Sequence, residues 1–312
     1  MAVSGGRAGL DPGRGALSPP RPALRATLIG GIAVLLWSLL ALLTLGAAGL
    51  PPFQLLAMTF AVAFLASTAV LARRGRQALA RLRQPPAVWL LGVGGLFGFH
   101  FFYFVALANA PAVEASLIAY LWPLLIVLFS ALLPGERLRW FHLGGAVMGL
   151  GGAVLLVTHG GTVAFNAQHL PGYLAALACA LTWSGYSVLN RRFGRVPSDV
   201  VGGFCGVVAV LGWVCHRLLE ETVTPDAGQW LAVAGLGLGP VGAAFFVWDY
   251  GVKHGNIQVL GALSYAAPLL STLLLIAFGR APATWVVGAA CALIVGGALL
   301  ASMTLARSQP AS

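Results

Sequence analysis

Residues 116–125 read Ser116-Leu-Ile-Ala-Tyr120-Leu-Trp122-Pro123-Leu-Leu125, an apolar run that holds a tyrosine, a tryptophan and a proline within four positions. Residues 261–270 read Gly261-Ala-Leu-Ser264-Tyr265-Ala-Ala-Pro268-Leu-Leu270 and repeat the core Tyr-x-x-Pro-Leu-Leu 145 positions later. Two related apolar runs at this separation predict matching helices in the two halves of a duplicated chain.

The composition excludes a soluble globular domain. Hydrophobic residues make up 59% of the chain and charged residues 8%, and the mean hydropathy is +0.90. A bilayer core about 30 Å thick takes about 20 apolar residues per helix, so we predict an all-α integral membrane protein. A membrane barrel would instead show alternating segments of about ten residues. The ten predicted transmembrane helices cover residues 27–46, 53–72, 87–108, 112–133, 140–158, 171–190, 198–219, 229–251, 256–279 and 283–305.

The basic residues fix an orientation for these helices. With the N-terminus in the cytoplasm, 16 of the 18 Lys and Arg residues fall on the cytoplasmic side, and Arg217 and Arg280 fall outside. This asymmetry predicts that both termini are cytoplasmic. The net charge of +10 then serves contact with anionic lipid headgroups rather than with nucleic acid. The cytoplasmic set is Arg7, Arg14, Arg21, Arg25, Arg73, Arg74, Arg76, Arg81, Arg83, Arg137, Arg139, Arg191, Arg192, Arg195, Lys253 and Arg307.

The two ends of the chain are expected to be tails. Residues 1–26 are rich in Gly, Pro, Ala and Arg and have little to bury, so we expect a disordered cytoplasmic tail there. A signal peptide is the alternative. The apolar run that follows is longer than a typical signal segment and lacks a convincing small-residue cleavage site, which favours a first helix. Residues 306–312 form the expected C-terminal tail.

The duplication extends over the whole apolar region. Leu36-Trp37-Ser38 recurs as Thr182-Trp183-Ser184, and Trp140 recurs as Trp285, with offsets of 146 and 145 positions. We therefore expect two repeats, residues 27–158 and 171–305, joined by a periplasmic linker at 159–170. Five helices per repeat invert the second copy, and inverted repeats are typical of transporters that alternate between two open states.

Glycine pairs and prolines predict how the helices pack and bend. Small residues four apart let membrane helices approach closely, and the chain offers Gly94-xxx-Gly98, Gly145-xxx-Gly149, Gly235-xxx-Gly239 and Ala292-xxx-Gly296. Pro123, Pro240 and Pro268 lie well inside predicted helices, where each removes a backbone hydrogen bond. We expect hinges or cavity-widening bends there, with passive kinks as the alternative.

Aromatic residues near the predicted midplane indicate a cavity. Trp37, Trp122 and Trp183 fall close to the middle of their helices, where an indole N–H that faces lipid would be unsatisfied. They are expected to face inward, either toward a cavity or packed with the N–H on a neighbouring carbonyl. Such a lining suits planar aromatic or bulky apolar solutes. The tyrosines expected to join it are Tyr103, Tyr120, Tyr186 and Tyr265, whereas the aromatic belt explains Trp89, Trp140, Trp230 and Trp285.

Few ionisable residues fall within the predicted helices. His100 lies in mid-helix and is a candidate for substrate contact or gating, with a neutral imidazole bonded inside the bundle as the alternative. The acidic residues map to tails, loops and helix ends, which argues against strong proton or sodium coupling. Asp249 and Lys253, spaced i,i+4 at a cytoplasmic helix end, could close that side, but the pattern favours an ordinary surface pair.

The stretch Ala106-Leu-Ala-Asn109-Ala-Pro-Ala-Val-Glu114-Ala-Ser-Leu-Ile118, followed by Pro123-Leu and Gly135-Glu136-Arg137, resembles the signature of the EamA family in the drug/metabolite transporter superfamily. The second half has Ala281-Pro282 in place of Glu136-Arg137. Tyr120-Leu-Trp122-Pro123 and Leu181-Thr-Trp183-Ser184 are similar to the group of bacterial aromatic amino acid exporters. The resemblance implies ten helices around a cavity lined by Tyr120, Trp122 and Trp183, with His100 facing it. Phe99 departs from the tyrosine typical of that group.

These observations favour an inner-membrane exporter of aromatic and related apolar amino acids that works by uncoupled alternating access. The alternatives are export of another metabolite or of a toxic organic cation such as methyl viologen, and a membrane enzyme, receptor or scaffold that does not transport. We expect a monomer in contact with lipid, without cofactor, metal or nucleic acid. Tyr120 and Pro123 recur in the second repeat as Tyr265 and Pro268 whereas Trp122 becomes Ala267, so Trp122 is the sharper candidate for substrate contact.

Overall fold

The computed structural model describes residues 21–303 and is helical, with no strand among these residues. Three short turns interrupt or flank the helices: η1 (Ala167–His169), η2 (Asn190–Phe193) and η3 (Gly239–Ala243). The helices are α1 (Arg21–Trp37), α2 (Leu40–Gly46), α3 (Pro52–Arg73), α4 (Arg76–Ala80), α5 (Pro86–Asn109), α6 (Ala112–Ala119), α7 (Trp122–Ser130), α8 (Trp140–Thr158), α9 (Leu170–Leu189), α10 (Val200–Leu219), α11 (Ala227–Leu238), α12 (Ala244–His254), α13 (Ile257–Leu263), α14 (Ala266–Ala277) and α15 (Trp285–Ala301).

Within residues 21–303, nine helical stretches are long and apolar enough to cross a membrane, so the protein is a multi-pass membrane protein. The tenth predicted segment forms α15, which has 17 residues and spans about 25 Å at 1.5 Å per residue. α1 begins at Arg21, so the last residues of the expected N-terminal tail are helical. Residues 1–20 and 304–312, including Arg7, Arg14 and Arg307, lie outside the described residues.

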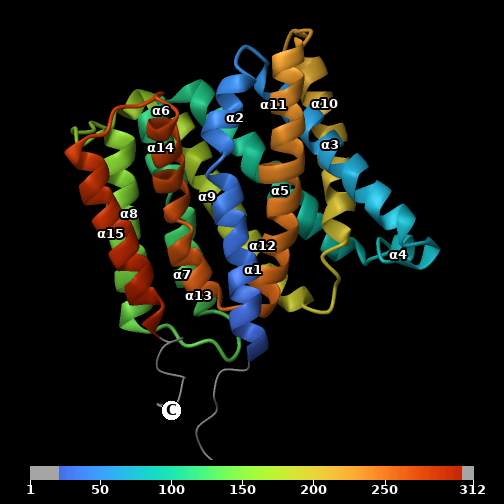
Figure 1. Ribbon diagram of the computed structural model, residues 1–312, viewed down its shortest axis with the longest axis horizontal. Helices are drawn as coiled ribbons and strands as arrows, with labels where there is room; N and C mark the ends of the chain where they lie inside the picture. Colours follow the sequence, from blue (N-terminus) through green and yellow to red (C-terminus); the bar gives the residue numbers. More distant parts are fainter. Residues whose placement is uncertain (1–20, 304–312) are drawn as a thin grey trace, which may run out of the picture.

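Four helix pairs dominate the packing: α1 with α12, α3 with α10, α5 with α9, and α8 with α15. Each pair joins a helix of the first half to a helix of the second. Figure 1 shows α8 and α15 at one side of the bundle and α3 and α10 at the other. At the α8–α15 contact a Cβ on Gly145 would lie 2.4 Å from the carbonyl oxygen of Gly297, so only glycine permits this approach. In the Gly94-xxx-Gly98 motif, nothing lies within 4 Å of a Cβ built on Gly94, whereas a Cβ on Gly98 would lie 3.1 Å from the side chain of Thr182 in α9.

The helices are interrupted near the middle of the bundle. α6 and α7 are separated by Tyr120 and Leu121, and α13 and α14 by Ser264 and Tyr265, so the equivalent residues Tyr120 and Tyr265 both lie at an interruption. α11 and α12 are joined by the π-helical turn η3.

The three prolines lie at these interruptions, where the sequence predicts hinges or bends. Pro123 and Pro268 lie in the first turns of α7 and α14, where a missing N–H is tolerated, and Pro240 lies within the π-helical turn η3.

The two ends of the bundle differ in charge. α1 begins and α15 ends at the same end (Figure 1), and α3, α7, α9 and α12 also end there. This end, which we call the arginine-rich end, carries Arg73, Arg74, Arg81, Arg191 and Arg192. The connection between α2 and α3 lies at the opposite end (Figure 1).

Candidate substrate cavity

A cavity of about 670 Å³ occupies the middle of the bundle and reaches the end opposite the arginine-rich end, since residues 47–50 of the α2–α3 connection and Pro52 of α3 line its mouth. This volume lies in the range of small-molecule sites. The lining is mostly apolar, with a few hydroxyl groups and one imidazole. Besides the mouth, the lining includes Trp37, Thr44, Leu55, Leu56, Thr59, Phe60, Phe99, His100, Tyr103, Phe104, Ser116, Tyr120, Trp122, Trp183, Leu236, Pro240, Val241, Phe245, Ser264, Ala267, Pro268 and Ser271.

Three indoles form the floor of the cavity. The ring centroids of Trp37, Trp122 and Trp183 lie 5.8–6.2 Å apart, and the three pairs meet edge to face. Each such pair stabilises the fold by about 0.5–1.5 kcal/mol beyond the contribution from burying the rings. The structure thus brings together the three tryptophans that sequence position alone had singled out. Phe245 completes the floor at 5.6 Å from Trp183.

A fourth indole, that of Trp248, lies against the other three and is fully buried. Its ring centroid lies 5.1 Å from that of Trp37, and its Nε1 donates to the hydroxyl of Ser187 at 3.1 Å. The sequence reasoning missed Trp248. The repeat supplies a signal for Trp248, because the offset of 145 positions makes it the equivalent of Tyr103, which is one of the residues predicted to line the cavity.

Trp37 is fixed by the interrupted helix opposite it. Its Nε1 donates to the carbonyl oxygen of Pro240 at 3.2 Å, so the π-helical turn holds one edge of the floor. An indole N–H bonded to a neighbouring carbonyl is one of the two arrangements that the sequence predicts for an inward-facing tryptophan. Trp37 nonetheless lines the cavity, so the two arrangements coexist at this residue.

His100 and Tyr103 line one wall. The Nδ1 of His100 lies 2.7 Å from the carbonyl oxygen of Leu96, and its ring meets Phe60 edge to face. The hydroxyl of Tyr103 lies 3.3 Å from that of Ser116. Both residues therefore present polar groups within an aromatic surface.

The remaining tyrosines differ in position. Tyr120 lines the cavity. Tyr265 and Tyr186 are buried outside it, which corrects the expectation that they contact substrate. The ring of Tyr186 packs where Gly95 leaves room, since a Cβ there would lie 2.5 Å from its Cγ. No hydrogen-bond partner for its hydroxyl lies among the described residues.

Beneath the floor, toward the arginine-rich end, Asp249 and Lys253 form an ion pair at 2.8 Å. Each side chain is only 1% exposed, so the surface pair favoured from the sequence is wrong: η2 and the chain after it cover both residues. Asn190 and Ser198 also donate to the carboxylate of Asp249, at 2.7 Å and 2.5 Å. This fully bonded carboxylate lies below the cavity and does not line it.

A second network closes the arginine-rich end. The guanidinium of Arg191 pairs with Glu136 at 2.6 Å and donates to the carbonyl oxygens of Val252 and Gly255. Gln258 donates to the other oxygen of Glu136 at 2.9 Å. The network joins the segment after α7, turn η2 and the α12–α13 junction, and so ties together the two halves of the chain.

The polar side chains of the lining are hydroxyl groups and the imidazole of His100. Among the described residues that line the cavity there is no Asp, Glu, Lys or Arg. Within residues 21–303, no three His, Cys, Asp or Glu side chains lie close enough to hold a metal ion.

A bundle of membrane-spanning helices around a blind, aromatic-floored cavity defines a membrane transporter for small molecules. The chain belongs to the EamA-like transporter family, whose model matches residues 24–158 and again residues 170–303.

Two relatives and one solved structure resemble nearly the whole chain. An aromatic amino acid exporter, YddG, of Ancylobacter novellus is 56% identical over 283 residues, covering 90% of this chain and 98% of that protein. The YddG exporter of Escherichia coli is 27% identical over 298 residues, covering 88% and 96%. A crystal structure of a protein 54% identical in sequence superposes with a TM-score of 0.87 and covers 92% of this chain and 99% of that one.

Proposed function

We propose that this protein exports aromatic and related apolar amino acids across the bacterial inner membrane, by alternating access and without ion coupling. The observation that carries the proposal is the floor of three indoles in a cavity whose described lining residues include no Asp, Glu, Lys or Arg. The name of the relative with 56% identity over most of the chain supports the same substrate class.

In this proposal the substrate's ring lies on the indoles of Trp122 and Trp183, where edge-to-face contacts favour an aromatic side chain. The polar end of the amino acid meets His100, Tyr103 and Tyr120 at the wall. Backbone carbonyls at the helix interruptions add acceptors for its ammonium group, as in transporters with discontinuous helices. The carbonyl of Ala119, a residue that lines the cavity, is the candidate, because Pro123 has no N–H to donate to it. The corresponding carbonyl of Ser264 already accepts from the backbone N–H of Ala267 at 3.1 Å.

The proposed topology has ten membrane-spanning helices, with α15 as the tenth, and both termini in the cytoplasm. Residues 27–158 and 171–305 are two inverted repeats joined by a periplasmic linker at 159–170. The helix pairing supports this, since a two-fold axis that exchanges the repeats maps α1–α12 onto α9–α5 and leaves α3–α10 and α8–α15 unchanged. The positions of the arginines support the orientation.

Alternating access then interconverts the present cavity, open away from the arginine-rich end, with one that opens toward the cytoplasm. The Glu136–Arg191 and Asp249–Lys253 networks form the cytoplasmic gate in this account. The interruptions next to Pro123, Pro240 and Pro268 are the hinges. Among the described residues, the lining offers no carboxylate to bind and release a coupling ion.

A substrate panel tests the proposal with purified protein acting as a monomer in liposomes. Preloaded phenylalanine should exchange with external tyrosine and tryptophan but only weakly with alanine or lysine. An indole floor also offers cation–π contacts, so methyl viologen belongs in the same panel. Exchange with methyl viologen but with no aromatic amino acid would replace the proposed substrate class with organic cations.

A further inference from the structure

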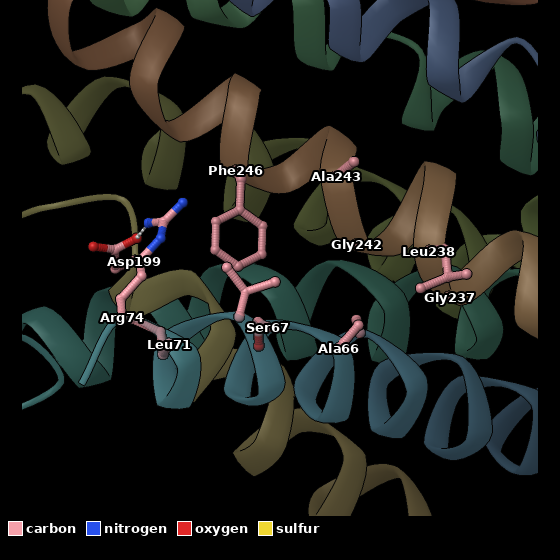
Figure 2. A pocket seen from close by; sticks show the side chains of 12 residues that line it. Ala66, Ser67, Leu71, Arg74, Asp199, Gly237, Leu238, Gly242, Ala243 and Phe246 are labelled. Atoms are coloured by element: carbon pink, nitrogen blue, oxygen red, sulfur yellow. Dashed lines mark hydrogen bonds and ion pairs between the residues drawn. The ribbon is translucent and has the colours of Figure 1, made fainter. Parts of the chain in front are cut away.

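A second, outward-facing groove of about 230 Å³ runs between α3 and the α11–η3–α12 segment. Figure 2 shows side chains of α3 along one wall and those of the other segment along the opposite wall, with Arg74 and Asp199 at one end and Leu238 at the other. The groove is separate from the substrate cavity and shares no lining residue with it. Its lining consists of Ala63, Ala66, Ser67, Val70, Leu71, Arg74, Asp199, Gly237, Leu238, Gly242, Ala243 and Phe246.

The groove faces the surrounding bilayer and not the interior of the bundle. Leu238 is 55% exposed and Val70 is 47% exposed, and Ala243 is also exposed. Small side chains at Ala66 and Ala243 leave the space open between the two walls (Figure 2). An apolar channel of this kind at the lipid-facing surface matches the chemistry of a hydrocarbon chain.

The end of the groove carries an excess of positive charge. Asp199 accepts from Arg81 at 2.8 Å and faces Arg74 at 3.5 Å. The arginine side chains are 55% and 58% exposed, so one carboxylate faces two accessible guanidiniums. Residues 71–90 hold five arginines and no acidic residue, so this end of the groove stays positive.

We propose that the groove binds an anionic phospholipid, with an acyl chain between α3 and η3 and the headgroup phosphate on Arg74 and Arg81. The charge excess selects an anionic headgroup, because basic clusters at the cytoplasmic surface attract anionic lipids. Guanidiniums also match phosphate geometry better than a point charge does. A free phosphate would leave the apolar length of the groove unfilled. The lipid would lie against the outer side of the turn whose Pro240 and Val241 line the substrate cavity.

Native mass spectrometry of the full-length protein tests the site, with phosphatidylglycerol and phosphatidylcholine of identical acyl chains as the probes. The wild type should retain phosphatidylglycerol in preference. The double variant Arg74→Gln/Arg81→Gln should lower retention of phosphatidylglycerol about fivefold for each arginine and leave phosphatidylcholine unchanged. The matched control Arg217→Gln/Arg280→Gln removes two exposed charges at the opposite end and should change neither.

Ala243→Phe tests the acyl-chain seat separately, since a phenyl ring there fills the groove and should lower retention of both lipids. Ala292→Phe, at an exposed position on α15, is its control. Equal retention of the two lipids by the wild type, or equal effects of the two arginine double variants, would show diffuse surface attraction and overturn the proposal. Unchanged retention in Ala243→Phe would overturn the placement of the chain. Substrate exchange does not enter these readouts, so they are independent of the proposed function.

Discussion

The hydroxyl of Tyr265 donates to the backbone carbonyl oxygen of Tyr120 at 3.1 Å, although the two tyrosines occupy equivalent positions 145 residues apart. The same hydroxyl accepts from the backbone N–H of Leu124 at 3.2 Å. Tyr265 therefore bonds both sides of the α6–α7 interruption, whereas Tyr120 lines the cavity. Tyr265 of the second half thus stabilises the helix interruption of the first half, whereas its equivalent, Tyr120, faces the cavity.

Tyr265→Phe should lower the free energy of unfolding by about 1–3 kcal/mol, because it leaves two buried backbone groups without a partner. Tyr120→Phe should change stability little and weaken substrate affinity. Thermal unfolding in detergent and the concentration dependence of transport separate the two effects. The assignment of roles is wrong if the two variants give the same pair of changes.

Glu136→Gln should favour opening of the arginine-rich end, because it removes the charge that pairs with Arg191 across the two halves. The loss of about 1 kcal/mol for a partly exposed pair gives a roughly fivefold shift toward the open state. Spin labels at positions 137 and 192, in a background without the native cysteines, report the separation. Glu114→Gln, which acts on the contact with Tyr173 at the opposite end, is the control and should not lengthen this distance.

Asp249→Asn should destabilise the protein by about 3–5 kcal/mol, because it leaves the ammonium of Lys253 buried without its charge partner. The double variant Asp249→Asn/Lys253→Met should recover much of this loss, since it buries no charge. Melting temperatures of the two variants, measured in the same detergent, check the coupling. A double variant no more stable than Asp249→Asn would contradict it.

The sequence predicts the helices and the floor of the cavity well, because apolar length and mid-helix position are local properties. Trp37, Trp122 and Trp183 could be grouped by depth alone. Which way a side chain points depends on partners distant in sequence, so Tyr265 and Tyr186 were placed in the cavity incorrectly. The burial of Asp249 depends on coverage by the chain around Asn190, which an i,i+4 pattern does not contain.

Glycine packing illustrates the same limit and gives a paired test. The Gly94-xxx-Gly98 motif predicts a helix contact at both glycines, but only Gly98 meets α9, at Thr182, and Gly95 outside the motif meets the ring of Tyr186 more closely. Gly95→Ala should therefore cost about 1–3 kcal/mol through overpacking, whereas Gly94→Ala should stay within about 0.5 kcal/mol of the wild type. Thermal unfolding of the two variants decides which face of α5 packs against α9.

The most direct test of the account is efflux of phenylalanine down its gradient from liposomes that hold only this protein, with and without a pH gradient. We predict saturable efflux that the pH gradient does not change. Trp183→Ala should reduce the efflux by up to about tenfold through the lost ring contacts, and Trp140→Ala, at an exposed indole, should leave it unchanged. Efflux no faster than from empty liposomes would contradict the account.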